Sequence, residues 1–154
     1  MGYYKNATIC LNGHTVSDTE ANYTDFCSKC GKSTFSICTN CSEPIRGMFC
    51  EPEAFIFEFE KPSYCFKCGN PFPWIEILIN NAVELISLDE NLSNEDKEII
   101  KNALPDLIIE TPTSPLATAK YKKFIPKAAQ YIQEGIRNLL VDVASETVKK
   151  SLWD

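Results

Sequence analysis

The sequence is poor in the residues and motifs that most often carry catalysis. Its 154 residues include a single histidine, His14, so the commonest general base is present only once. It has no glycine-rich phosphate-binding loop, and it lacks the His-x-Glu and Pro-Cys-x-x-Cys motifs of zinc deaminases. Carboxylates are plentiful, but no motif pairs two of them. We therefore expect a non-enzymatic protein.

Long apolar segments are also missing. No stretch reaches the roughly 20 apolar residues that a membrane-spanning helix needs. The first residues have neither the basic start nor the apolar core of a signal peptide. The formal net charge of −6 makes attraction to nucleic acid or to an anionic membrane unfavourable. These features favour a cytoplasmic protein without a membrane span.

The chain has two halves of different composition. Residues 1–73 hold all eight cysteines and five of the six glycines, and they show no sustained helical periodicity. Residues 74–154 hold one glycine and are helical in pattern almost throughout. The Asn-Pro-Phe-Pro segment at residues 70–73 separates the halves, because proline ends one element and can start a helix. The pattern predicts a small α+β protein with domains 1–73 and 74–154.

The second domain is predicted to contain three to four helices. In residues 74–87 the polar positions recur at spacings of three and four, which predicts one narrow exposed stripe on a buried helix; they are Glu76, Asn80, Glu84 and Ser87. Ser93 is a candidate N-cap for a second helix, which Pro105 ends. The Ser114-Pro115 pair predicts the N-cap and first residue of a third. Pro126 either kinks that helix or starts another, and the last helix is predicted to reach Leu152.

The first domain contains one clear strand signal. Phe55, Phe57 and Phe59 alternate with Ile56, Glu58 and Glu60, a period-two pattern that predicts a strand with an aromatic face. Such a face would cover a metal site in a domain too small for a full apolar core.

Seven of the cysteines and His14 form four close pairs. One pair has Cys-x3-His spacing and three have Cys-x2-Cys spacing; they are Cys10 with His14, Cys27 with Cys30, Cys38 with Cys41, and Cys65 with Cys68. Ligands this close on one turn can reach a single tetrahedral ion. Gly31 and Gly69 follow the second cysteine of two pairs, where a zinc knuckle needs positive φ. Thiols stay reduced in the cytosol, so metal binding is the favoured explanation.

Four pairs provide the ligands of two complete sites. Sequential use gives site one (Cys10, His14, Cys27 and Cys30) and site two (Cys38, Cys41, Cys65 and Cys68). This predicts tandem zinc ribbons with two structural Zn²⁺ ions, since four protein ligands leave no open coordination position. The alternative is a cross-brace, in which the first and third ligand pairs form one site and the second and fourth pairs form the other. Loop lengths favour the sequential arrangement.

Other uses of the cysteines fit less well. An even count allows a disulfide framework, but an export signal is missing and the paired spacing suits metal better. A redox Cys-x-x-Cys centre needs a thioredoxin-like βαβ context, which is absent. Cys50 lies outside every pair and is predicted to be a plain thiol, because nearby Glu51 and Glu53 oppose thiolate formation.

Together these motifs resemble a bacterial family of small zinc-ribbon proteins classed as a domain of unknown function. The similarity rests on Cys-x3-His in residues 7–14, Cys-x2-Pro-Ile-Arg-Gly in residues 41–47, and Pro-Ser-Tyr-Cys-x2-Cys-Gly-x-Pro-Phe-Pro-Trp in residues 62–74. Residues 104–116 and 140–150 are similar too. The resemblance implies a double zinc-ribbon domain followed by helices. It implies no activity, and Cys50 does not belong to the shared pattern.

The sequence favours a protein–protein interaction adaptor or regulator, whose helical half serves docking or self-association. Residues 76–110 carry nine acids and two lysines, whereas residues 111–154 carry seven basic residues and four acids. Opposite charges on successive helices suit packing within one chain or between two.

Three alternatives remain at this point. A nucleic-acid-binding zinc ribbon is disfavoured because residues 1–73 carry six basic and eight acidic side chains, and seven thiolates outweigh two zinc ions, which brings the domain to about −5. A RING-like ubiquitin-ligase scaffold would need the cross-brace. A part in a bacterial stress or phage-defence system has no direct support in the residues.

Overall fold

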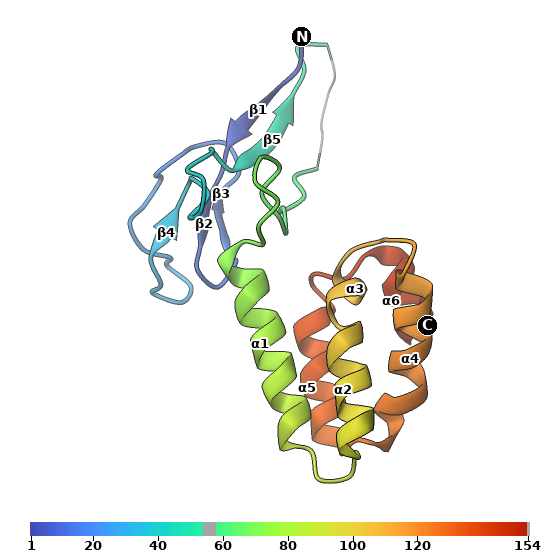
Figure 1. Ribbon diagram of the computed structural model, residues 1–154. Helices are drawn as coiled ribbons and strands as arrows, with labels where there is room; N and C mark the ends of the chain where they lie inside the picture. The colour runs from blue at the N-terminus through green and yellow to red at the C-terminus, as the bar shows by residue number, and fades with distance from the viewer. Residues whose placement is uncertain (54–57, 154) are drawn as a thin grey trace. The chain divides into compact units, whose positions relative to one another are not determined.

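The computed structural model of the chain describes residues 1–53 and 58–153 (Figure 1). Short strands come first: β1 (Tyr3–Asn6), β2 (Thr8–Cys10), β3 (Thr15–Ser17), β4 (Thr34–Phe35) and β5 (Arg46–Cys50). The helices follow: α1 (Pro73–Leu88), α2 (Asn94–Ala103), α3 (Pro105–Ile108), α4 (Ser114–Phe124), the 3-10 turn η1 (Ile125–Lys127), α5 (Gln130–Leu140) and α6 (Glu146–Trp153). The predicted small α+β class is confirmed.

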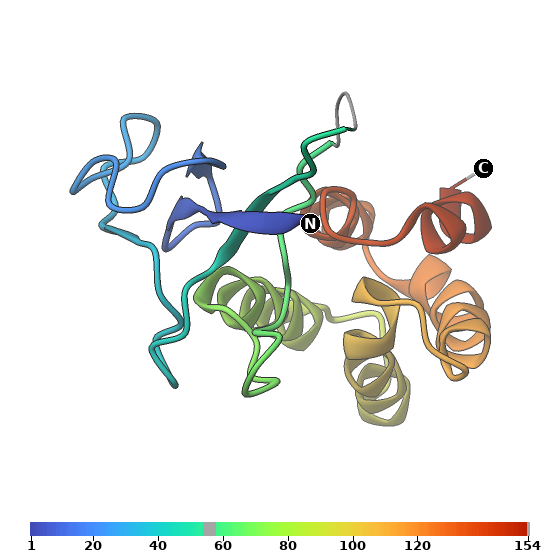
Figure 2. The same ribbon diagram turned by 90° about the horizontal axis from the view of Figure 1, so that it is seen from above.

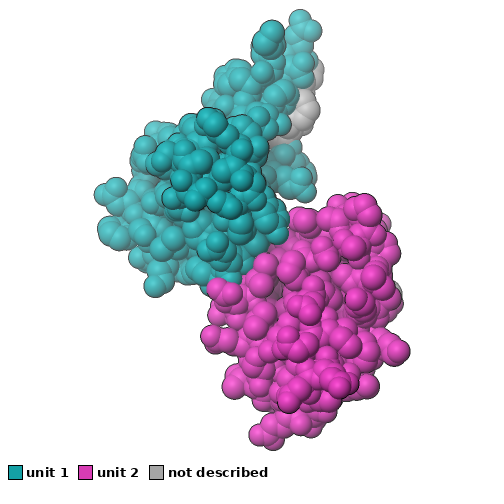
Figure 3. Space-filling view, in the orientation of Figure 1, with its two compact units in different colours: residues 1–77 teal, residues 78–154 magenta. Residues whose placement is uncertain are grey.

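The chain divides into two compact units, residues 1–77 and residues 78–154, which Figure 3 colours separately. The predicted boundary after residue 73 lies just inside α1. The first turn of α1 belongs with the strands because the Trp74 ring stacks on the rings of Phe72 and Phe35, with centroids 4.8 and 5.7 Å apart. The prolines therefore mark the start of the helix and not the end of the first unit.

The strands of the first unit form two small antiparallel sheets. β1 pairs with β5, and Tyr4 lies opposite Phe49 in this pair; Figures 1 and 2 show the two strands side by side. β2 lies between β3 and β4 in the other sheet. Strands of two to five residues bury little apolar surface, so these sheets need additional fastening.

A buried network of polar side chains provides part of the additional stabilisation that the small sheets need. The Thr8 hydroxyl, which is fully buried, donates to the Glu20 carbonyl at 2.6 Å and lies 2.9 Å from the Ser36 hydroxyl. Ser36 in turn accepts the backbone N–H of Asn22 at 2.8 Å. The Asn6 amide donates to the carbonyls of Ser36 and Ile45 at 2.8 and 3.1 Å. Buried polar groups that are all paired in this way fix loops which have no sheet of their own.

The predicted strand through Phe55, Phe57 and Phe59 falls mostly outside the described residues. Phe55 and Phe57 are not described, and residues 58–60 form neither helix nor strand. Among the described residues between Cys41 and Cys65, the structure places strand β5, which pairs with β1.

The helical unit has more helices than the three to four expected. Six α-helices and one 3-10 turn occur in the described part from Pro73 onward. Pro105 both ends α2 and opens the separate short helix α3, since its ring is compatible with a first helical turn. The expected last helix is also broken, because α5 ends at Leu140 and the Ser145 hydroxyl caps α6 by accepting the Val148 N–H at 3.2 Å.

Two predicted caps have different outcomes. Ser93 is the N-cap of α2, and its hydroxyl accepts the Asp96 N–H at 3.1 Å. Ser114 is not a cap but the first residue of α4, after Thr113. Its buried hydroxyl instead contacts the carbonyls of Asp106 and Ile109 at 2.9 and 2.8 Å. The side chain thus joins α4 to the end of α3.

The exposed stripe predicted on α1 is present but wider than expected. Glu76, Asn80, Glu84 and Ser87 are all exposed, while Ala82 and Ile86 are fully buried. Ile77 departs from the prediction, with 41% of its surface exposed. Helical spacing alone placed it on the buried side.

Asp89 is a buried carboxylate in the turn between α1 and α2. It is 2% exposed and directly follows Leu88, the last residue of α1. One carboxylate oxygen accepts the backbone N–H groups of Asn91 and Leu92 at 2.9 and 2.7 Å, and the other accepts that of Ala129 at 2.8 Å. Burial raises the pKa of this carboxyl, but the hydrogen bonds from Ala129, Leu92 and Asn91 outweigh it and hold the pKa below its usual value. Asp89 therefore joins the α1–α2 turn to the residue before α5.

Gly135 on α5 lies against Leu85 on α1. A methyl group built at Gly135 would stand 3.2 Å from a terminal carbon of Leu85. This close approach, together with the Asp89–Ala129 hydrogen bond, holds α1 and α5 together within the second unit. No helix among the described residues is long and apolar enough to cross a membrane.

Replacing Asp89 tests this buried junction. Asp89→Ala removes the acceptor of three N–H groups, of which that of Leu92 is buried, and should lower the free energy of unfolding by about 1 to 3 kcal/mol. Helix melting followed by far-UV circular dichroism measures the loss, and exposed Glu90→Gln is the matched control. The pKa of Asp89 is lower in the folded than in the unfolded protein. Its contribution to the free energy of unfolding is therefore fully present above the unfolded pKa near 4. The contribution is lost as the pH falls through the folded value, and hydrogen exchange at Leu92 and Ala129 should accelerate there. Unchanged melting of Asp89→Ala would show that the junction is dispensable.

Candidate metal centres

Three knuckles of nearly identical backbone geometry carry the cysteine pairs. In each, the N–H of the residue after the second cysteine donates to the carbonyl of the first cysteine; the bonds are Gly31 to Cys27 at 2.8 Å, Ser42 to Cys38 at 2.9 Å and Gly69 to Cys65 at 2.9 Å. The N–H of each first cysteine donates to a carbonyl five residues later, at Lys32, Glu43 and Asn70. The Cys10–His14 turn is a variant, closed by the Gly13 N–H on the Cys10 carbonyl at 2.9 Å. Each turn thereby presents two ligand atoms on one side.

Every one of these turns contains a residue with positive φ. Gly13, Gly31 and Gly69 have φ of 87°, 73° and 76°. The positive φ predicted for Gly31 and Gly69 is therefore confirmed, and Gly13 adds a third such position. The remaining knuckle places Ser42 at φ 63°, a conformation that costs an L residue roughly 1 to 2 kcal/mol. The sequence does not indicate this position, because serine carries no signal for a left-handed backbone.

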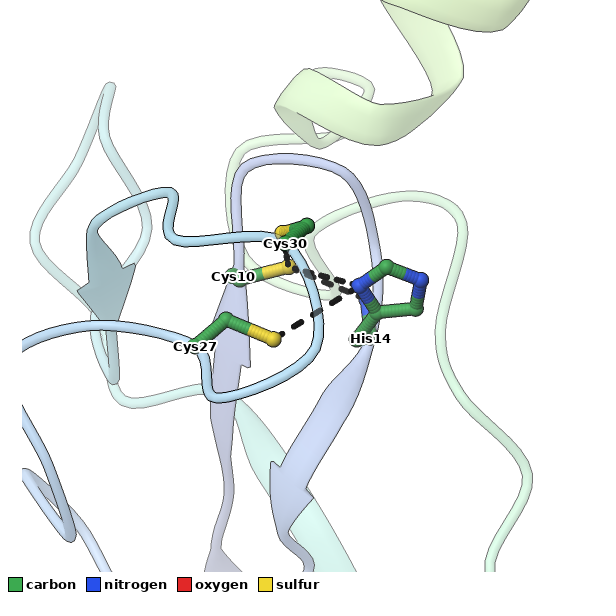
Figure 4. A group of neighbouring side chains, drawn as sticks. All are labelled: Cys10, His14, Cys27 and Cys30. Atoms are coloured by element: carbon green, nitrogen blue, oxygen red, sulfur yellow. Dashed lines mark hydrogen bonds between the residues drawn. The ribbon is translucent and has the colours of Figure 1, made fainter.

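The first cluster gathers Cys10, His14, Cys27 and Cys30 (Figure 4). The Cys10 and Cys30 sulfurs lie 3.7 Å apart, and His14 Nδ1 lies 3.5 Å from the Cys10 sulfur and 3.6 Å from the Cys27 sulfur. Cys10 and Cys27 are buried, while His14 and Cys30 are half-buried. The cluster combines the end of β2 and its following turn with the first knuckle.

The second cluster gathers Cys38, Cys41, Cys65 and Cys68 from the other two knuckles. The Cys38 and Cys68 sulfurs are 3.7 Å apart, and those of Cys41 and Cys65 are 3.6 Å apart. In each cluster the four ligand atoms lie within 4.8 Å of one another. The structure thus brings together all eight predicted ligands in the sequential grouping, and the cross-brace arrangement is not the one formed.

These distances can be tested against the geometry of a tetrahedral zinc ion. With Zn–S bonds of about 2.3 Å and Zn–N bonds of about 2.0 Å, tetrahedral angles place two sulfurs about 3.8 Å apart and a sulfur and a nitrogen about 3.5 Å apart. The sulfur pairs at 3.6 to 3.7 Å and the sulfur–nitrogen pairs at 3.5 to 3.6 Å fit these edges. A disulfide would hold two sulfurs near 2.05 Å, and all eight cysteines are unbridged. The ligand set and spacing suit a tetrahedral thiolate-binding metal ion.

The backbone of the knuckles is arranged to stabilise thiolates. The N–H groups of His14, Lys29 and Asn40 donate to the sulfurs of Cys10, Cys27 and Cys38 at 3.3 to 3.4 Å. A hydrogen bond from the backbone of Asn70 lowers the pKa of the Cys68 thiol to about 6. The backbone of Lys32 likewise lowers the pKa of Cys30.

Neighbouring sulfurs act in the opposite direction on other members of the same clusters. A hydrogen bond from the Glu43 backbone lowers the pKa of Cys41, but burial and the sulfurs of Cys65, Cys68 and Cys38 outweigh it and raise the value to about 12. Burial raises the pKa of Cys10 in the first cluster. Four thiolates this close repel one another, so all four ionise together only beside a cation.

Lys61 and Trp74 cover the turn that carries the first two ligands. The Lys61 ammonium donates to the Gly13 carbonyl at 2.6 Å and lies 5.6 Å from the centre of the Trp74 ring. A methyl group at Gly13 would stand 2.9 Å from both Lys61 Nζ and Trp74 Cβ. Glycine is therefore required at this turn both for its φ and for space. Neither covering residue has ligand chemistry, so sequence spacing alone did not identify them.

Cys50 lies outside both clusters. It is half-buried on β5, opposite Tyr3 of β1. This placement agrees with the expectation that Cys50 is not a ligand.

Exchanging residues at the positive-φ positions tests the knuckle geometry. A methyl group at Gly69 would meet no atom within 4 Å, so Gly69→Ala pays only the backbone strain and should lower the free energy of unfolding by about 1 kcal/mol. Ser42→Gly should instead raise it by a few tenths to about 1 kcal/mol, because strain is relieved. Denaturant unfolding of metal-loaded protein measures both, with Ser28→Ala on an exposed knuckle position as control. If Gly69→Ala and Ser42→Gly changed the free energy of unfolding in the same direction, the assignment of positive φ to these two positions would be wrong.

Comparison with known proteins adds the family. Neither curated proteins nor solved structures gave a match to the chain. A family model described as "Uncharacterized protein conserved in bacteria (DUF2321)" matches residues 3–152. This match spans both metal clusters and the helices from α1 to α5, so the chain belongs to that bacterial family.

Proposed function

We propose that the protein binds two structural zinc ions and acts as a non-enzymatic interaction module for another protein. The observation that carries the first part is the closure of both clusters. Each offers four cysteine or histidine ligands at the edge lengths of a zinc tetrahedron, which leaves no corner for a substrate or a reactive water. A metal held in this way contributes folding free energy rather than chemistry.

The interaction role is supported by what the metal centres hold in place. The first unit has a small apolar core, short strands and two metal-binding clusters, an arrangement that yields a rigid surface from few residues. Several of its large apolar side chains are about half or more exposed; they include Tyr3, Tyr4, Tyr23, Phe26 and Phe66. Aromatic residues are enriched at protein interfaces. Nucleic acid is the weaker candidate because the metal-loaded unit remains negatively charged.

Metal content tests the zinc assignment. Protein purified without added metal should carry two zinc ions per chain by native mass spectrometry and elemental analysis. The double variant Cys27→Ser/Cys30→Ser should carry one, as should Cys65→Ser/Cys68→Ser, because each removes half of one ligand set. Cys50→Ser is the matched control and should keep both ions. Iron in place of zinc, or one ion in the unaltered protein, would refute the assignment of two zinc sites.

Partner recovery tests the interaction role. Chemical crosslinking in the native bacterial cell, followed by mass spectrometry, should yield a stoichiometric protein partner or a second copy of this chain. The crosslinks should disappear in Cys65→Ser/Cys68→Ser and persist in Cys50→Ser. A monomer that crosslinks to nothing, or one that carries nucleic acid, would contradict the adaptor role while leaving the zinc assignment intact.

A further inference from the structure

Arg46 lies between two aromatic rings on the first unit. Its guanidinium carbon is 4.4 Å from the centre of the Tyr4 ring and 3.7 Å from the centre of the Phe66 ring. Tyr4 in turn packs on Phe49, with ring centroids 4.9 Å apart. We refer to Phe49, Tyr4, Arg46 and Phe66 as the Arg46 stack. Rings on either side hold a guanidinium in one orientation at little entropic cost.

The members of the Arg46 stack come from three different elements. Tyr4 belongs to β1, Arg46 and Phe49 belong to β5, and Phe66 lies within the third knuckle between Cys65 and Cys68. Tyr4 and Phe49 face each other in the β1–β5 pair. Phe66 lies between Cys65 and Cys68, which are two ligands of site two. The shape of the Arg46 stack therefore depends on that metal centre.

The charge of Arg46 is not neutralised by any side chain in the described part of the chain. Across residues 1–53 and 58–153, the guanidinium makes no ion pair and no side-chain hydrogen bond. Lys67, which follows Phe66 in the third knuckle, differs in this respect because its ammonium pairs with the Glu43 carboxylate at 3.0 Å. Arg46 is exposed, and so are its ring neighbours Tyr4 and Phe66, at 48% and 51%. The guanidinium thus lies over two half-exposed rings and, among the described residues, has no acceptor for its N–H groups.

From this geometry we infer that the Arg46 stack is a docking surface for a carboxylate-bearing segment of a partner protein. The inference rests on the proposed interaction role and names the surface and the chemistry that it recognises. A planar guanidinium fork binds a carboxylate through two parallel hydrogen bonds. The half-exposed rings of Tyr4 and Phe66 offer apolar contact for the residues beside that carboxylate. Arginine and tyrosine at a packed centre are the composition of an interface hot spot.

Charge favours a peptide carboxylate over a nucleic-acid phosphate. Residues 1–73 carry two more acids than bases, and two zinc ions do not neutralise seven thiolates. A polyphosphate chain would bring many charges toward this negative unit, and its binding depends on several lysine or arginine contacts. A single acidic side chain needs only the one arginine that the stack presents.

Selection from a phage-displayed library of random peptides tests the inference with the full, zinc-loaded chain. Selected peptides should be rich in aspartate or glutamate flanked by apolar residues. Their affinity should fall at least about tenfold on Arg46→Lys, which keeps the charge but loses the fork, and fall comparably when the acidic residue of the peptide becomes its amide. Phe66→Leu should weaken binding as well. Lys32→Gln, at an exposed lysine of another knuckle, is the matched control and should change nothing.

The outcomes separate this surface from the broader role. Zinc content of two per chain and unchanged melting would establish that Arg46→Lys remains folded. Peptides that bind Arg46→Lys as tightly as the unaltered protein would overturn the docking surface while leaving the adaptor role standing. Failure to select any peptide would count against both. A 12-nucleotide single strand that binds more tightly than the peptides, in an Arg46-dependent manner, would replace the carboxylate with phosphate as the ligand.

Discussion

Mutual repulsion between closely placed sulfurs is the constraint on which the first unit depends. Within each cluster four ligand atoms lie inside 4.8 Å, and the same proximity that suits a tetrahedral ion raises the pKa of Cys41 to about 12. A divalent ion removes this conflict by neutralising the thiolates that the backbone N–H groups already favour. Apart from ligands, the described residues of this unit include only a few large buried apolar side chains, Ile9, Ile45, Phe72, Trp74 and Ile75 among them. A metal ion bound at each cluster would therefore take the place that an apolar core has in a larger domain.

The helical unit is stabilised mainly by a buried apolar core. Its fully buried side chains are aliphatic, among them Ile100, Leu104, Ile132, Ile136 and Leu140. Asp89 is the exception, because three backbone N–H groups compensate its burial. The two units thus rely on different physical terms, one on charge neutralised at defined points and the other on apolar area removed from water.

Most of the features that could be predicted depend on the spacing of residues that are close together in the sequence. The ligand pairs, the positive φ after Cys30 and Cys68, and the Ser93 cap are all properties of a few consecutive residues, so the sequence displays them. Features that depend on distant segments were not accessible. The role of Asp89 requires Ala129 forty positions away, and the Arg46 stack requires three separate elements. The break between α5 and α6 was missed because the apolar spacing continues across residues 141–145, although a serine there can start a new helix. Ser42 shows a further limit, since the hydrogen bonds of its knuckle hold it at positive φ against the preference of an L residue.

The separation of the two ligand sets along the chain has a consequence for biosynthesis. The first set is complete at Cys30 and the second begins only at Cys38, so neither loop encloses the other. Each closure spans a short stretch, and the entropy of closing it is correspondingly small. A ribosome that has released residues 1–30 has already released every ligand of site one, before any ligand of site two has been synthesised. Metal loading can thus proceed in the order of translation, and an error at the later site leaves the ligands of the earlier one in place.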